Sequence, residues 1–83
     1  MRFDYKTQGV CASKIEFDID GDVVNNIRFI GGCNGNTQGI SRLIEGMPVE
    51  EAIRRMEGIR CGFKSTSCPD QLAQALKQTL QQD

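Results

Sequence analysis

Histidine is absent from the chain. Because histidine is the side chain whose charge changes most readily near neutral pH, general acid–base chemistry here would fall to carboxylates. One group of carboxylates that could be considered for this role is Asp18, Asp20 and Asp22. Their alternate spacing, however, is typical of the solvated edge of a hairpin and its turn. These observations argue against an independent enzyme, and we expect no catalytic residue.

Long apolar runs and a bias of charge are missing as well. No stretch approaches the ~20 apolar residues that a membrane-spanning helix requires. The first six residues alternate in polarity and carry charge, which is not the pattern of a signal peptide. We therefore expect a cytoplasmic protein with no membrane partner. Ten basic and eleven acidic residues leave a net charge of −1, so the basic bias typical of a nucleic-acid binder is absent too.

What is present fits one small globular domain. With 83 residues, of which 39% are hydrophobic and 25% charged, the chain is long enough for a single domain over residues 1–83. Domains of this size often gain stability from a metal ion or from disulfides. Because thiols stay reduced in the cytoplasm, we favour metal or redox chemistry, while a disulfide framework is the structural alternative.

The first half of the chain alternates as strands do. Residues 2–6, 14–20 and 24–31 predict three strands, and Gly21 lies where a tight hairpin turn would join the second to the third. The apolar positions of this hairpin are expected to share one buried face: Ile15, Phe17, Ile19, Ile27 and Phe29.

The second half changes to helical spacing. Apolar residues over 40–47 predict a first helix capped among residues 34–37, and a second helix is expected over 48–57, with Gly58 ending it. A third is expected from Cys68 to Leu80. The apolar residues expected on the first and third helices are Ile40, Leu43, Ile44, Met47, Leu72, Ala73, Leu76 and Leu80. Strands followed by helices predict an α+β fold, a three-stranded antiparallel sheet packed by about three helices.

Four cysteines lie at the ends of these elements or in glycine-rich loops: Cys11, Cys33, Cys61 and Cys68. Intervals of 21, 27 and 6 residues separate them, so spacing alone is a weak zinc signature. The hairpin strengthens it, because one register keeps the apolar residues on one face. That register pairs Phe17 with Ile27, Ile15 with Phe29, Ser13 with Gly31 and Cys11 with Cys33. Directly opposed residues have Cα atoms ~4.5–5.5 Å apart, so these two thiols would meet.

Cys68 lies at the head of the third helix. Pro69 suits the first helical position, which makes Cys68 or Ser67 the N-cap. The positive end of the helix dipole favours a thiolate there. Cys61 lies in the short loop before the helix. Thiolate ligands favour zinc or an iron–sulfur cluster over harder metals, whereas four buried structural cysteines and a redox pair are the alternatives.

Residues 66–70 read Thr-Ser-Cys-Pro-Asp, the motif that names the TSCPD domain family. The segments 9–11, 31–36 and 39–43 also resemble short stand-alone members, so the likeness covers nearly the whole chain. The family includes a domain at the C-terminal end of cobalamin-dependent ribonucleotide reductases. The resemblance implies a ribonucleotide reductase partner, and thereby nucleotide binding and DNA biosynthesis. The reductase reaction itself needs a barrel of ~250 residues, so we expect the chain to accompany such an enzyme.

A more distant resemblance is to iron–sulfur assembly scaffolds of the NifU/IscU type. Those proteins gather a cluster or zinc with three cysteines, which correspond here to Cys11, Cys33 and Cys68. This chain departs from them at Ser13, where the scaffolds have Asp, and at Ser67, where they often have His. Cys61 would supply a fourth thiolate and close the site, which is typical of structural metal sites.

The sequence thus predicts a zinc-binding accessory domain that is not catalytic alone. The first alternative is an iron–sulfur or sulfur scaffold or carrier. The second is a thiol relay, in which Cys61 and Cys68 cycle through a disulfide to serve a ribonucleoside-diphosphate reductase.

Overall fold

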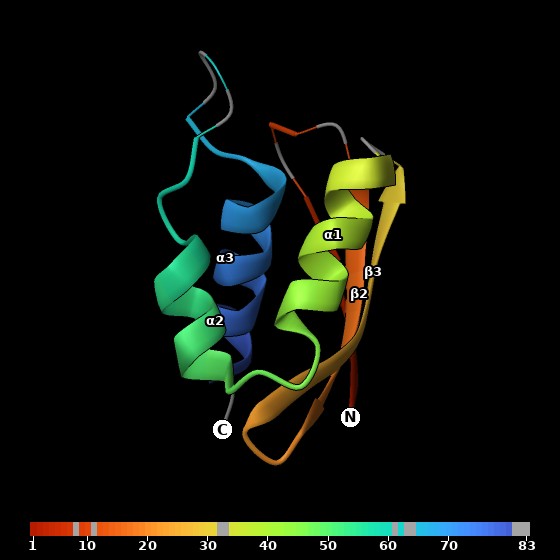
Figure 1. Ribbon diagram of the computed structural model, residues 1–83, viewed down its shortest axis with the longest axis vertical. Helices are drawn as coiled ribbons and strands as arrows, with labels where there is room; N and C mark the ends of the chain where they lie inside the picture. The colour runs from red at the N-terminus through yellow and green to blue at the C-terminus, as the bar shows by residue number, and fades with distance from the viewer. Residues whose placement is uncertain (8, 11, 32–33, 61, 63–64, 81–83) are drawn as a thin grey trace.

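In the described part of the chain, three antiparallel strands are followed by three helices, which confirms the α+β prediction (Figure 1). The computed structural model describes residues 1–83 except 8, 11, 32, 33, 61, 63, 64 and 81–83. The elements are β1 (Arg2–Lys6), β2 (Ala12–Asp20), β3 (Val23–Gly31), α1 (Asn34–Ile44), α2 (Val49–Met56) and α3 (Cys68–Leu80). The strands lie in the order β1-β2-β3, so β2 is central and β3 is an edge strand.

The hydrophobic core lies between one face of the sheet and the helices (Figure 1). Its largest fully buried side chains are Phe17, Ile15, Leu72, Leu76 and Val24. Burying each such side chain contributes roughly 1.5–3 kcal/mol. The alternation of β2 therefore predicted the inner face correctly, with Ile15 and Phe17 at most 1% exposed. Among the described residues, none of the helices has the length and apolar character needed to cross a bilayer.

The hairpin register is confirmed at the pair of Ile15 and Phe29, and it departs from the prediction at a bulge on either side of that pair. Ile15 pairs with Phe29 as predicted, but Gly31 pairs with Ala12 and not with Ser13. A register shift between Ala12 and Lys14 leaves Ser13 as an extra residue, and its hydroxyl donates to the Ile30 carbonyl at 3.1 Å. Strict alternation does not reveal such bulges. The predicted pairing of Cys11 with Cys33 lies outside the described residues.

A second bulge is centred on Asn26, opposite the interval between Glu16 and Asp18. Phe17 therefore faces two residues of β3, Asn26 and Ile27, and the predicted pairing of Phe17 with Ile27 alone is too simple. Asn26 has φ +53°, a left-handed conformation that asparagine tolerates better than most residues. Its backbone N–H donates to Glu45 Oε1 at 2.9 Å, and its amide Nδ2 donates to Asp18 Oδ2 at 2.9 Å.

The bulge gives a first testable prediction. Asn26→Val should lower the free energy of unfolding by about 1–3 kcal/mol, because a β-branched residue is strained at positive φ. Asn26→Gly loses the same bond to Asp18 but adopts this φ freely, so it should cost clearly less. Urea unfolding of the two variants makes the comparison. Equal losses would show that the backbone conformation of Asn26 carries no strain.

Helix α1 is the element that departs most from expectation. It begins at Asn34, six positions before the apolar pattern, so residues 34–37 form its first turns instead of preceding them. It ends at Ile44, and Gly46, with φ +77°, follows it. Ile44 is buried as predicted, but Leu43 is 77% exposed. Helix α1 packs against the edge strand β3 (Figure 1), and Leu43 lies on a side of the helix that this contact leaves exposed.

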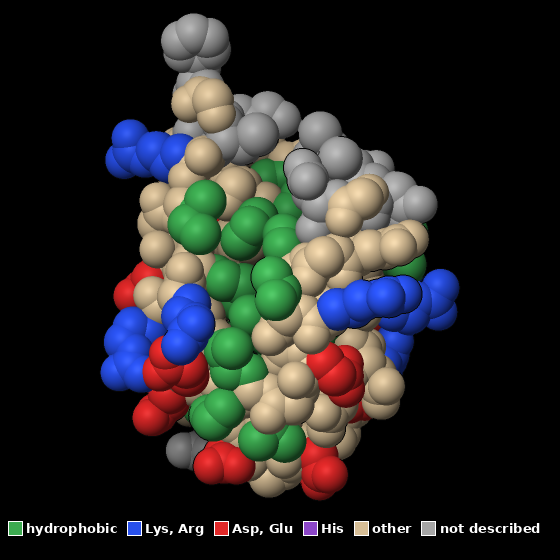
Figure 2. All heavy atoms as spheres, in the orientation of Figure 1, with side chains coloured by type: hydrophobic (Ala, Val, Ile, Leu, Met, Phe, Trp, Pro, Cys, Tyr) green, Lys and Arg blue, Asp and Glu red, His purple; other side chains and the backbone are tan. Residues whose placement is uncertain are grey.

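The other two helices follow the prediction closely. Helix α2 spans Val49–Met56 with Pro48 at its N-cap, and Gly58 adopts φ +84° just after it. In α3 the predicted residues Leu72, Ala73 and Leu76 are fully buried, whereas Leu80, at its last residue, is 51% exposed. On the face shown in Figure 2, hydrophobic side chains gather in a band that runs between α1 and the α2–α3 pair.

Candidate metal centre

Cys68 is the first residue of α3, forms no disulfide with the described residues, and is partly exposed. Ser67 caps the helix, because its hydroxyl oxygen accepts the Asp70 N–H at 3.2 Å. Cys68 and Ser67 were both predicted as possible N-cap residues, and the structure has Ser67 in this position. Pro69 is then the second helical residue, one position later than predicted. The cap holds Cys68 in the first turn, where the unpaired N–H groups of the helix lie.

Asp70 is the buried centre of the motif, with only 6% of its surface exposed. Its Oδ1 accepts the Gly58 N–H at 2.7 Å, and its Oδ2 accepts the Gln74 amide at 2.9 Å and the Thr66 hydroxyl. Thr66 in turn accepts a hydrogen bond from Gln71 at 3.0 Å. From the sequence alone Asp70 had no assigned role beyond its place in the Thr-Ser-Cys-Pro-Asp motif. Ser67 and Asp70 have the spacing of a capping box, and this is the sequence signal from which a structural role of Asp70 could have been predicted.

The hydrogen bonds to Asp70 and its burial shift the pKa of this carboxyl in opposite directions, and the hydrogen bonds have the larger effect. Burial alone raises the pKa of this carboxyl, because a desolvated charge is costly. The donors Thr66, Gly58 and Gln74, together with the charge of Lys77, lower it further than burial raises it, so the pKa of Asp70 lies below its ordinary value. The group is therefore a buried carboxylate satisfied by its neighbours.

A pH dependence follows from this lowered pKa. A carboxyl whose pKa is depressed by folding stabilises the protein fully above its unfolded value, ~3.9, and loses that contribution as the pH falls through the folded value. The difference in stability between the wild type and Asp70→Asn should thus be constant from pH 7 to about 5 and shrink below pH 4. Urea unfolding of both proteins across this range measures it. A difference that stayed constant down to pH 3 would contradict the assignment.

Two hydrogen bonds close the loop between α2 and α3. Asp70 holds Gly58, and the Ser67 hydroxyl donates to the Ile59 carbonyl at 2.7 Å. The loop that follows Ile59 and carries Cys61 therefore has its two ends fixed side by side. Cys61 itself lies outside the described residues. In Figure 1 the described part of this connection extends beyond the start of α3.

The loop between β1 and β2 reaches the same region. Gly9 has φ +73°, and a Cβ at this position would lie 3.3 Å from Thr66 Cγ2. The Thr7 hydroxyl donates to the Ala12 carbonyl and closes this loop at its base. The end of β3 and the start of α1 lie at the same end of the molecule (Figure 1). The described neighbours of Cys11 and Cys33 therefore come to the end at which Cys68 lies.

Three of the four predicted ligands, Cys11, Cys33 and Cys61, lie outside the described residues. Within the part of the chain that the structure does describe, His, Cys, Asp and Glu side chains form no group of three that could hold a metal ion. Cys68 fits a soft metal, since its thiol is partly exposed at this end. Asp70, the nearest described carboxylate in sequence, is already bonded to three donors and is buried. Among the predicted ligands, Cys68 is therefore the one that the structure describes, and its sulfur is the ligand type that suits zinc or iron–sulfur clusters.

Comparison with known proteins gives one result. The family model of the TSCPD domain matches residues 3–80, which include all six strands and helices almost entirely. No curated protein and no solved structure matches the chain.

Proposed function

Because the chain belongs to the TSCPD domain family, we propose that it is a small accessory domain that binds a metal ion. The metal is zinc, and its ligands are the four thiolates of Cys11, Cys33, Cys61 and Cys68. The observation that carries this proposal is the contrast between Cys68 and the other residues of the family motif. Thr66, Ser67 and Asp70 are buried and hydrogen-bonded, whereas Cys68 between them is partly exposed.

The arrangement around Cys68 supports a ligand better than a structural cysteine. A thiol in the first turn of a helix is favoured as thiolate, the form that binds metals. The motif residues hold Gly58 and Ile59, where the loop that carries Cys61 begins, and Gly9 brings the segment before Cys11 against Thr66. Four thiolates would make a closed site, which stabilises a fold and leaves no open position for catalysis.

The partner we propose is a ribonucleotide reductase, as the family resemblance implies. The domain would serve deoxynucleotide synthesis by binding to the enzyme and not by performing the reaction. Its size supports this role, since 83 residues cannot enclose a catalytic barrel of ~250 residues. Mixing the purified domain with a cobalamin-dependent ribonucleotide reductase should give a complex in sedimentation analysis. Independent sedimentation of the two proteins would overturn the partner assignment.

Metal analysis tests the binding proposal. Protein purified without oxygen should be colourless and carry one zinc per chain, and each of the four Cys→Ser variants should lose it. Iron with visible absorption, lost only in the Cys11, Cys33 and Cys68 variants, would favour an iron–sulfur scaffold instead. A metal-free protein in which Cys61 and Cys68 oxidise reversibly would favour the thiol relay and overturn the metal proposal.

A further inference from the structure

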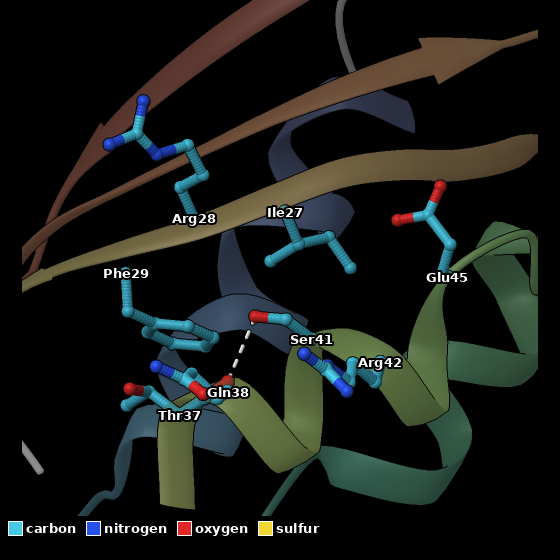
Figure 3. Close-up of a pocket in the computed structure, with 8 residues that line it drawn as sticks. All are labelled: Ile27, Arg28, Phe29, Thr37, Gln38, Ser41, Arg42 and Glu45. Carbon is cyan, nitrogen blue, oxygen red and sulfur yellow. Dashed lines mark hydrogen bonds between the residues drawn. The ribbon is translucent and has the colours of Figure 1, made fainter. Parts of the chain in front are cut away.

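A pocket of about 530 Å³ lies between the edge strand β3 and helix α1. Ile27 and Phe29 point from β3 towards the helix and form its apolar side (Figure 3). The helix contributes polar side chains, among them Gln38, Ser41 and Arg42. None of the lining residues is a cysteine or belongs to the Thr-Ser-Cys-Pro-Asp motif, so the pocket is separate from the proposed metal centre.

The guanidinium of Arg42 is available to a ligand. Within the described part of the chain Arg42 forms no ion pair or hydrogen bond, and its side chain is exposed. Three other arginines are engaged in ion pairs: Arg54 and Arg55 both pair with Glu51, and Arg2 pairs with Glu16 and Asp18. A free guanidinium offers five N–H donors in a planar fork that matches the oxygens of a carboxylate or a phosphate.

Glu45 is the acidic residue that lines the pocket, and its carboxylate already accepts a hydrogen bond. Glu45 lies at the end of the pocket away from Phe29 (Figure 3). Its Oε1 accepts the backbone N–H of Asn26 at 2.9 Å, so this carboxylate is held on the bulge of β3. The Ser41 hydroxyl donates to the Thr37 carbonyl of its own helix at 2.8 Å, which leaves its oxygen only as an acceptor. The cationic fork of Arg42 is thus the strongest group that the pocket offers to an anion.

We propose that this pocket binds a small organic anion. The anionic group, a phosphate or a carboxylate, pairs with Arg42, and a planar apolar body packs against Ile27 and Phe29. The combination is typical of ligand sites, in which apolar walls supply contact area and a few polar groups fix orientation. Both parts are needed, because an exposed arginine alone holds an anion only weakly in water.

The test is a titration of the ¹⁵N-labelled protein, as purified, with phenyl phosphate. Backbone signals of β3 and α1 should shift with a Kd in the millimolar range or tighter, and Arg42→Gln should weaken binding about tenfold. Arg28→Gln is the matched control, because Arg28 is also a lining residue on β3, but Figure 3 shows its side chain on the side of the strand opposite to Ile27 and Phe29. It should change the Kd less than twofold. Spectra of both variants without ligand report whether they are folded.

Three further probes separate the two halves of the site. Inorganic phosphate lacks the apolar body and phenol lacks the charge, so each should bind at least several-fold more weakly than phenyl phosphate. Benzoate distinguishes a carboxylate from a phosphate as the preferred group. Equal binding of inorganic phosphate and phenyl phosphate, or equal weakening by Arg28→Gln and Arg42→Gln, would overturn the proposal. Absence of shifts in β3 and α1 would overturn it as well.

Discussion

Removing the metal from the purified protein with a chelator should lower the free energy of unfolding by about 4 kcal/mol. This is the stabilisation expected when free ligand exceeds its Kd about a thousandfold and binds only the folded state. The effect is large because the ion would join segments far apart in the chain, the two loops of the sheet and the start of α3. Urea unfolding at pH 7 with and without chelator measures it, and added zinc should restore the loss.

Cys68→Ser provides the control for this result. The variant lacks a ligand, so it should start near the stability of the chelated wild type and show no further loss with chelator. A wild-type protein whose unfolding midpoint is the same in the presence and absence of chelator would contradict a structural metal.

Asp70→Asn should lower the free energy of unfolding by about 2–4 kcal/mol at pH 7. The carboxylate accepts hydrogen bonds from Thr66, Gly58 and Gln74 in a site that is 6% exposed. An amide keeps one oxygen but turns an NH₂ group towards donors, and a buried donor without a partner costs about 1–3 kcal/mol. The loss of a buried charge from its partners adds to this cost. Urea unfolding of the metal-loaded proteins measures the difference.

Asp20→Asn is the matched control, because Asp20 is an exposed carboxylate at the end of β2. It should change stability by less than ~0.5 kcal/mol. Asp70→Asn should also weaken metal binding ~10–100-fold, as loss of groups that support ligands commonly does. If Asp70→Asn and Asp20→Asn were equally stable, the buried network would not hold the loop of Cys61.

The sheet and the last helix were predictable because their patterns are strong and local. Ile15 and Phe17 alternate with polar residues, and only one face of the sheet is covered, so period two defines the inner side. Helix α3 begins where Ser67 and Pro69 predict, to within one residue. Bulges leave no trace in such patterns, since Ser13 and Asn26 differ from their neighbours only in how the backbone pairs.

Helix α1 was harder to predict because its first half is polar and contains two glycines. Gly35 and Gly39 lower helix propensity, so the apolar residues after them dominated the prediction. The spacing of apolar residues also could not show that Leu43 is exposed to solvent. Its exposure depends on which part of α1 the rest of the protein covers.

The choice of Cys11, Cys33, Cys61 and Cys68 as ligands stays a prediction from the sequence, whereas the hydrogen bonds around Cys68 were not predicted. The positions of the cysteines at element ends pointed to thiol chemistry. The burial of Asp70 and its bond to Gly58, twelve residues away, depend on how α2 and α3 pack together. The sequence pattern does not show that Asp70 and Gly58 lie within hydrogen-bond distance of each other. The motif residues Thr66, Ser67 and Asp70 form a buried hydrogen-bonded network at the start of the helix that carries Cys68.

The central claim is that four sulfur atoms gather around one ion. The X-ray absorption spectrum at the metal edge of the purified protein tests it most directly, because it counts the ligands by element and distance. We predict a zinc edge with four sulfur ligands at ~2.3 Å. A first shell dominated by oxygen or nitrogen, or an absence of bound metal, would contradict the account.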